Sequence, residues 1–202
     1  LKIGSEIIKS NVDTYRRLRN TIRFILGNLS DFSEDSSLEY SDLTDLDKYI
    51  LSQLAILEKN VLKNYEIFEY QKVFTLIFNF CTNELSSFYF DIRKDSLYCD
   101  SKSSKIRRST QTVLAILFHH LLRLLAPILC FTIEEAWQSR MGSNTSIHNE
   151  NFCSIDETWI RNDLDESWSF YKKLKRLING AIEVERKNKT IGSSLEASVI
   201  LF

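Results

Sequence analysis

The chain of 202 residues carries 26 basic and 27 acidic side chains, and its formal net charge is −1. This length suits one large or two small domains and allows a sizeable core without disulfides or metals. Apolar residues make up 44% of the chain, which excludes a disordered protein. Only five glycines and one proline occur, which disfavours β-sandwiches, barrels and nucleotide folds that need glycine-rich turns. The composition therefore predicts an all-α protein.

The cysteines favour neither a disulfide framework nor a metal site. They are 18, 31 and 23 residues apart, at Cys81, Cys99, Cys130 and Cys153. This spacing contains no C-x-x-C and no short Cys/His cluster to complete a zinc tetrahedron, so we expect no metal in this chain. We expect reduced, buried thiols in a cytoplasmic protein. No signal peptide is apparent, and both ends look cut, as in an excised fragment.

The most apolar stretch, residues 113–137, is long enough to cross a bilayer. Its middle contains His119, His120, Arg123 and Pro127, which are costly in lipid. We therefore expect a buried helix and no membrane partner. Adjacent histidines point about 100° apart on a helix, so the two cannot chelate one ion together and a structural role is expected for both.

The first predicted helix covers residues 5–29. Its apolar residues fall on one arc: Ile8, Tyr15, Leu18, Ile22, Ile25, Leu26 and Leu29. Arg16, Asn20 and Arg23 lie on the opposite face. An acidic, serine-rich stretch follows at residues 31–50, and Ser41 or Thr44 is expected to cap a second helix that continues to residue 61.

A third helix is predicted at residues 65–90, with aromatic residues nearly all round it, so it should pack against several neighbours. A long helix at residues 104–140 should kink near Pro127. The last helix is predicted at residues 165–187, with the apolar arc Tyr171, Leu174, Leu177, Ile178, Ala181 and Ile182. Residues 199–202 read as the start of a strand.

These elements predict two regions. Residues 1–150 should form a bundle of about five helices. Residues 151–202 should provide a linker, a C-terminal helix and the start of a following small domain.

The near-zero net charge hides strong local charge. Residues 1–30, 102–108 and 172–189 carry +4, +4 and +5, whereas residues 31–50 and 150–166 carry −6 and −5. Basic blocks on helix faces can neutralise the phosphates of a nucleic acid, although they also occur as ordinary solvated surfaces. In the first block, Arg16, Asn20 and Arg23 share one ridge with Arg19 on its flank, so they can contact the phosphates or unstacked bases of an RNA loop.

Four stretches resemble, in order, motifs of bacterial-type isoleucyl-tRNA synthetases. Residues 15–32, YRRLRNTIRFILGNLSDF, resemble the first helix of that family's anticodon-binding domain. Residues 88–100 contain FYFD and KDSLYCD, similar to S-x-F-Y-x-D and K-D-x-L-Y-C-D. Residues 107–137 contain RRSTQT and LLAPILCFTIEEAW, similar to R-R-x-x-Q-T and L-L-A-P-I-x-P-F-x-x-E-E-x-W. Residues 191–197, IGSSLEA, match the element after the last helix.

The resemblance implies a parent enzyme that activates isoleucine with ATP and attaches it to tRNA(Ile). It implies that this part holds the anticodon stem-loop and contains no catalytic residue, since H-I-G-H and K-M-S-K-S are absent. ATP with Mg²⁺, and zinc, would bind elsewhere in the parent. The expected partners are tRNA(Ile) and other domains of the same synthetase, in a cytoplasmic monomer.

The expected RNA-binding residues fall into three groups, of which the first matches the polar positions of the first motif. The first group is Arg16, Arg19, Asn20 and Arg23. The second is Lys102, Lys105, Arg107 and Arg108, and the third is Lys172, Lys175 and Arg176.

Two alternatives stay open. One is a helical interaction scaffold that docks an acidic protein, which would show a large exposed apolar patch rimmed by charge instead of a cationic groove. The other is the equivalent domain of a valyl-, leucyl- or methionyl-tRNA synthetase. A small self-contained enzyme would need a pocket with convergent titratable side chains, which the sequence does not suggest.

Overall fold

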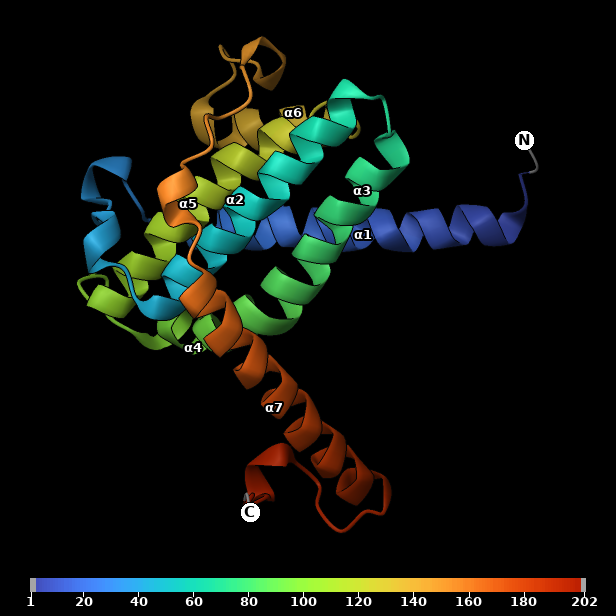
Figure 1. The fold of residues 1–202 in the computed structure, drawn as a ribbon, viewed down its shortest axis with the longest axis vertical. Helices are drawn as coiled ribbons and strands as arrows, with labels where there is room; N and C mark the ends of the chain where they lie inside the picture. The colour runs from blue at the N-terminus through green and yellow to red at the C-terminus, as the bar shows by residue number, and fades with distance from the viewer. Residues whose placement is uncertain (1–2, 201–202) are drawn as a thin grey trace. The chain divides into compact units, whose positions relative to one another are not determined.

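The computed structural model describes residues 3–200, which contain helices and no strand (Figure 1), so the all-α prediction is confirmed. The chain divides into two compact units, Leu1–Arg161 and Asn162–Phe202. The main helices of the first unit are α1 (Ser5–Asn28), α2 (Asp45–Glu66), α3 (Tyr70–Asn79), α4 (Phe90–Cys99), α5 (Lys105–Leu125) and α6 (Cys130–Met141). A π-helix, η3 (Phe80–Tyr89), joins α3 to α4. Short 3₁₀ turns are η1 (Glu34–Ser36), η2 (Tyr40–Asp42), η4 (Ile147–Asn149) and η5 (Glu157–Trp159). The second unit contains α7 (Asn162–Lys187) and η6 (Ser194–Glu196).

The division between the units falls after residue 161, whereas the sequence placed it after residue 150. Residues 151–161 have no helix of their own apart from one turn, but they pack on the bundle. The ring of Phe152 stacks on Tyr65 of α2 at a centroid distance of 5.7 Å. The backbone N–H of Arg161 donates to the hydroxyl of Ser52, also on α2, at 3.1 Å. These contacts attach the segment to the first unit.

Two helix starts are capped by hydroxyl side chains, and Thr44 is one of the two caps that the sequence offered for the second helix. The hydroxyl of Thr44 accepts from the backbone N–H of Asp47 at the start of α2, and the hydroxyl of Ser104 accepts from that of Arg107 at the start of α5. Each satisfies one backbone donor that a helix leaves without a partner in its first turn.

The long helix expected at residues 104–140 is broken, not kinked. Helix α5 ends at Leu125 and α6 begins at Cys130, with Pro127 in the turn between them. Proline has no N–H and clashes with the preceding turn, so the helical ladder stops there. The apolar stretch 113–137 is thus divided between two helices. Among residues 3–200, no helix combines the length and apolarity that a membrane crossing requires.

The aromatic residues around the end of η3 reach different neighbours, as expected. Phe88, Tyr89 and Phe90 are consecutive and all buried. The ring of Phe90 stacks on Phe24 of α1 at 4.2 Å, while Phe88 lies edge-on to Tyr49 of α2 at 6.3 Å. The aromatic segment therefore joins α1 and α2.

A buried polar cluster around Asp47 joins α2, α4 and α5. The carboxylate of Asp47 is fully buried and lies 3.2 Å from the guanidinium of Arg93. It also accepts hydrogen bonds from the hydroxyls of Tyr89, at 2.6 Å, and Ser109. Burial, and then the charge of Asp47, raise the pKa of Tyr89 well above 10.0, so its hydroxyl remains a donor.

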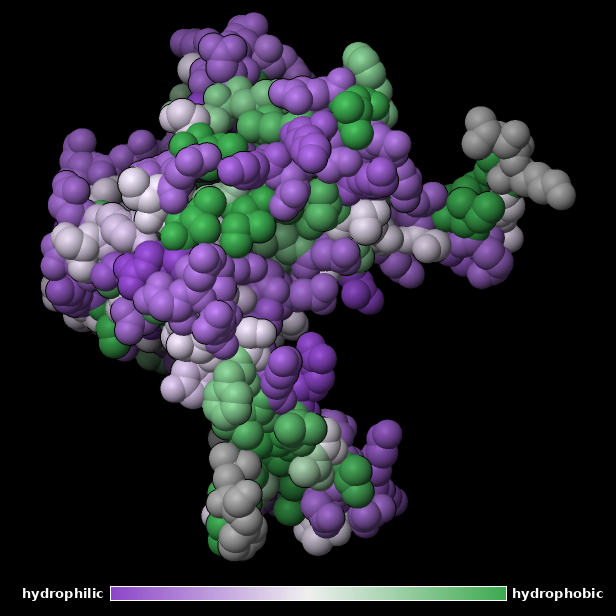
Figure 2. Space-filling view, viewed as in Figure 1, coloured by the Kyte–Doolittle hydropathy of each residue, from purple (hydrophilic) through white to green (hydrophobic). Residues whose placement is uncertain are grey.

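Several residues of the two predicted apolar arcs are exposed. Ile8 and Tyr15 of the first apolar arc are 54% and 37% exposed, because the N-terminal half of α1 extends past α3 (Figure 1). Hydrophobic side chains are visible at that end in Figure 2. No residue of α7 is buried. Of its apolar arc, Leu174, Ile178 and Ile182 are partly exposed, and Tyr171, Leu177 and Ala181 are exposed.

The cysteines and the chain end also differ from expectation. All four thiols are free, but only Cys81 is buried; Cys99 and Cys130 are exposed, and Cys153 is partly exposed. Burial raises the pKa of Cys81 to about 12. Of the expected strand start, residues 199 and 200 form no strand, and residues 201 and 202 lie outside the described residues.

Candidate nucleic-acid interface

The C-terminal end of α1 is held by polar side chains from two other helices. The side-chain amide of Gln111 on α5 donates to the carbonyl of Asn28 at 2.9 Å. The guanidinium of Arg140 on α6 donates to the carbonyl of Leu29 at 3.0 Å. Terminal carbonyls lack partners within a helix, and a cation is favourable beside them. The last turns of α1 therefore have a fixed position against the bundle.

Immediately after α1, Asp31 pairs with two cations of the basic block at residues 102–108. Its carboxylate lies 2.9 Å from the guanidinium of Arg107 and 3.7 Å from the ammonium of Lys102. It also accepts from the amide of Gln111 at 2.8 Å. Burial acts to raise the pKa of Asp31, but the hydrogen bond from Gln111 and the two charges lower it below 3.8. The ionised carboxylate is thus neutralised within the protein.

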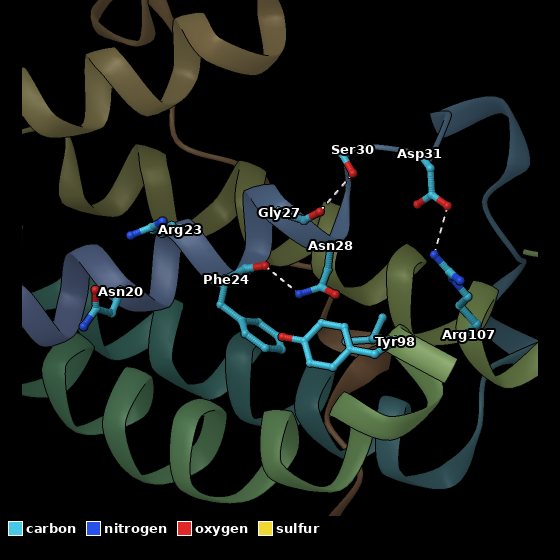
Figure 3. A pocket seen from close by; sticks show the side chains of 10 residues that line it. Asn20, Arg23, Phe24, Gly27, Asn28, Ser30, Asp31, Tyr98 and Arg107 are labelled. Carbon is cyan, nitrogen blue, oxygen red and sulfur yellow. Dashed lines mark hydrogen bonds and ion pairs between the residues drawn. The ribbon is translucent and has the colours of Figure 1, made fainter. Parts of the chain in front are cut away.

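An open groove of about 720 Å³ runs along α1 in this region (Figure 3). Residues 20–31 form one side, and Leu97, Tyr98 and Arg107 form the other. In Figure 3, Asn20 lies at one end and the Asp31–Arg107 pair at the other. A neighbouring hollow of about 310 Å³ shares Asn20 and Tyr98 and continues toward η3. We call these two hollows together the α1–α4 groove.

An exposed aromatic ring stands in the α1–α4 groove. Tyr98 is 64% exposed, and its ring lies edge-on to that of Phe24, with centroids 6.4 Å apart. Phe24 is in turn stacked on the buried Phe90. Sequence reasoning did not select Tyr98, although it lies within the KDSLYCD motif at residues 94–100. Exposed aromatic rings on a rigid support are the usual stacking platforms for unpaired bases.

The first group of predicted residues lies along α1, and the structure separates its members. Asn20 and Arg23 line the α1–α4 groove. Arg19 and Arg23 line a second hollow of about 250 Å³ between α1 and α6, which also contains Glu135. Arg16 lines neither hollow and pairs with Asp13 at 3.6 Å. Arg23 thus lies between the two hollows.

The side chains of Asn20 and Arg23 differ from most polar groups nearby. Within residues 3–200, neither side chain has a hydrogen-bond or ion-pair partner. Both are exposed. The amide and the guanidinium are therefore available to a ligand in the groove.

The second group mainly holds the acidic stretch after α1. Lys102 pairs with Asp31, and Lys105 pairs with Asp42 at 3.3 Å. Arg108 donates to the carbonyl of Ser36 at 2.8 Å. The side chain of Arg107 is only 16% exposed and also donates to the carbonyl of Asp100. Of these cations Arg107 lines the groove, and the side chains of the two lysines remain largely exposed.

The third group belongs to the second unit. Lys172 and Lys175 are partly exposed on α7, and Arg176 is exposed there.

Comparison with known proteins gives the family of the chain. The family described as the anticodon-binding domain of tRNA ligase matches residues 47–201. This match covers most of the chain, so the chain belongs to the family of tRNA-ligase anticodon-binding domains. Helix α1 lies before the matched region, but the alignments with individual relatives include it.

Those relatives are isoleucine–tRNA ligases. The ligase of Bartonella henselae is 43% identical over 201 residues, and that of Agrobacterium fabrum is 44% identical over 200. The ligase of Ruegeria pomeroyi is 44% identical over 202 residues. These alignments cover 99–100% of this chain but only 21% of each relative. The resemblance to isoleucyl-tRNA synthetases is confirmed, and the chain spans about a fifth of their length.

Proposed function

We propose that this chain binds the anticodon stem-loop of tRNA(Ile) and that the α1–α4 groove receives part of the loop. The observation that carries the proposal is the combination of Asn20, Arg23 and exposed Tyr98 along one open groove. An amide reads base edges, a guanidinium contacts phosphate or stacks on a base, and an aromatic ring stacks on an unpaired base. Unpaired loop nucleotides present all three targets.

The electrostatics of the groove support an anionic ligand. Asp31, the acidic side chain in its wall, is already paired with Arg107 and Lys102. In the continuation toward η3, Asp91 is paired with Lys94 at 3.1 Å. Arg23 has no such partner, so its charge is not compensated by a neighbouring carboxylate in the groove.

The proposed role in the parent protein is positioning. We propose that the parent attaches isoleucine to tRNA(Ile) with ATP; the relatives are named isoleucine–tRNA ligases. We propose that ATP with Mg²⁺, and the parent's zinc, bind outside these 202 residues. This part would hold the anticodon end while chemistry occurs at the other end of the tRNA. We also propose that the parent is a cytoplasmic monomer, and light scattering would test the monomeric state.

A salt-dependent titration tests the binding proposal. We expect a tRNA(Ile) transcript to bind the chain with an affinity that falls as salt rises, because contacts to phosphate release counterions. Arg23→Ala should weaken binding and lower the slope of log affinity against log salt by about one. Lys63→Ala is the matched control, since Lys63 is an exposed cation on α2 that lines neither hollow. Binding that is independent of salt, or equal loss in both variants, would refute the proposal.

The scaffold alternative has one observation in its favour. Ile7, Ile8 and Val12 are exposed on the N-terminal half of α1. A protein partner on that apolar face would be lost in Ile8→Asp, while binding of tRNA through the groove would remain. Pull-down of acidic proteins with these two variants, Ile8→Asp and Arg23→Ala, separates the two functions.

A further inference from the structure

Three side chains from distant parts of the sequence meet beside α2 and α5. Glu58 lies on α2, His120 on α5, and Cys153 in the segment that follows η4. One carboxylate oxygen, one ring nitrogen and the thiol sulfur all lie within 4.8 Å of one another. The residues are 62 and 33 positions apart, so the spacing of cysteines and histidines gives no sign of this cluster.

One carboxylate oxygen of Glu58 is buried without a hydrogen-bond partner among residues 3–200. Glu58 is 1% exposed, and its Oε2 lies 2.9 Å from Nδ1 of His120. Its other oxygen, Oε1, is buried and has no hydrogen-bond partner within residues 3–200. A buried oxygen without a partner costs about 1–3 kcal/mol, and more for a charged group. This atom belongs to the same carboxylate that contributes to the cluster, so the cluster is short of one positive or donating group.

The imidazole of His120 is packed on the other side by the ring of Trp159, with centroids 5.8 Å apart. Burial disfavours a charged ring, but hydrogen bonds to Cys153 and Glu58 raise the pKa of His120 to about 9. A cation would reach the cluster past Cys153, the member of the three that is partly exposed.

We propose that Glu58, His120 and Cys153 form a binding site for a divalent cation of the zinc class. Thiolate, imidazole and carboxylate together are ligands that zinc accepts. Calcium and magnesium require oxygen ligands, so this donor set disfavours both. Three protein ligands leave a fourth position of a tetrahedral ion for water.

The present geometry requires only a small adjustment to hold such an ion. Tetrahedral coordination at ordinary zinc–ligand distances places neighbouring ligand atoms about 3.3–3.5 Å apart. The cluster lies within 4.8 Å already, and Cys153 is on a segment outside any helix. The ion would join this segment to α2 and α5, next to the contact between Phe152 and Tyr65.

Titration of the 202-residue chain with Co²⁺, in a buffer with a non-thiol reductant, tests the site. We expect one equivalent of Co²⁺ to produce thiolate-to-cobalt charge-transfer absorption, which Zn²⁺ then removes by displacement. The absorption should disappear in Cys153→Ser and persist in Cys99→Ser, the matched control with an exposed thiol. Glu58→Gln should weaken Zn²⁺ binding by at least about tenfold.

A second measurement does not depend on variants that disturb the core. Zn²⁺ should slow alkylation of Cys153 by iodoacetamide at least tenfold, as mapped by mass spectrometry, and leave the rate at Cys99 unchanged. Circular dichroism checks that each variant is folded. Absence of the absorption, its persistence in Cys153→Ser, or unchanged alkylation of Cys153 would overturn the proposal.

Discussion

The ring of Tyr98 on α4 lies edge-on to that of Phe24 on α1, with an interplanar angle of 63°. Phe24 is stacked at 17° on Phe90, which is buried. The three rings thus form a continuous support that begins in the core and ends at an exposed side chain. Tyr98 is held by packing, yet most of its surface is open to a ligand.

This support predicts the effect of removing the exposed ring. Tyr98→Ala should lower the affinity for tRNA(Ile) by about tenfold, since stacking of one base on an aromatic ring contributes about 1–3 kcal/mol. Tyr98→Phe keeps the ring and should bind almost as the natural chain does. Fluorescence anisotropy with a labelled stem-loop measures both. A larger loss in Tyr98→Phe than in Tyr98→Ala would mean that the hydroxyl, not the ring, makes the contact.

The pKa of Asp31 predicts how stability depends on pH. Because the pKa is lowered in the folded protein relative to 3.8, ionised Asp31 stabilises the fold above that value. This contribution should fall away as the pH drops through the lowered pKa. Urea unfolding from pH 7 to pH 3 should show Asp31→Asn less stable than the natural chain at pH 7, with the two approaching each other at the acidic end. A constant difference across this range would contradict the assignment.

The buried Asp47–Arg93 pair should be important for folding. Arg93→Ala leaves the charge of Asp47 without its cation and should lower the free energy of unfolding by about 3 kcal/mol. Lys94→Ala is the adjacent control, because Lys94 pairs with Asp91 on the surface. Its effect should stay within about 0.5 kcal/mol. Equal losses in the two variants, measured by urea unfolding, would show that the buried pair contributes no more to the free energy of unfolding than the surface pair.

The side chain of Gln111 should stabilise the fold by holding the C-terminal end of α1 against α5. Gln111→Ala removes hydrogen bonds to the carbonyl of Asn28 and to Asp31, and should cost about 1–2 kcal/mol. Hydrogen exchange of residues 26–31 should become faster, while exchange in α2 is unchanged. Gln138→Ala removes a bond to Glu134 within α6 alone and serves as the control. Unchanged hydrogen exchange of residues 26–31 after Gln111→Ala would show that these hydrogen bonds do not hold the end of α1 in place.

Local patterns predicted much of the fold. Helical periodicity located α1 and α2, and Thr44 and Ser104 marked helix starts correctly. Periodicity indicates which face of a helix is apolar, but not whether anything covers it. Ile8 and the arc of α7 lie on predicted apolar faces, yet they are exposed or only partly buried.

The candidate site was predicted in part. Helical spacing and the motif selected Asn20 and Arg23, which line the groove, and charge counting selected Arg107, which pairs with Asp31. Whether an arginine is available to a ligand depends on its contacts within the protein. Arg107 contacts Asp31, which lies 76 positions away, and no local pattern contains such a contact. Tyr98 was missed for a similar reason. Its ring is held in the groove by Phe24 of another helix, and the local sequence does not show this contact.

The π-helix η3 also has a consequence for α4. A π turn contains more residues than an α turn, so each residue after it faces a direction that an unbroken α-helix would not give. Phe90 meets α1 and Tyr98 opens into the groove only with this register. An α-helix with the same number of residues in place of η3 would therefore rotate α4 about its axis and turn Tyr98 away from α1. The geometry of the groove is thus set in part by the π-helical form of η3, whose Ser86 also lines the groove.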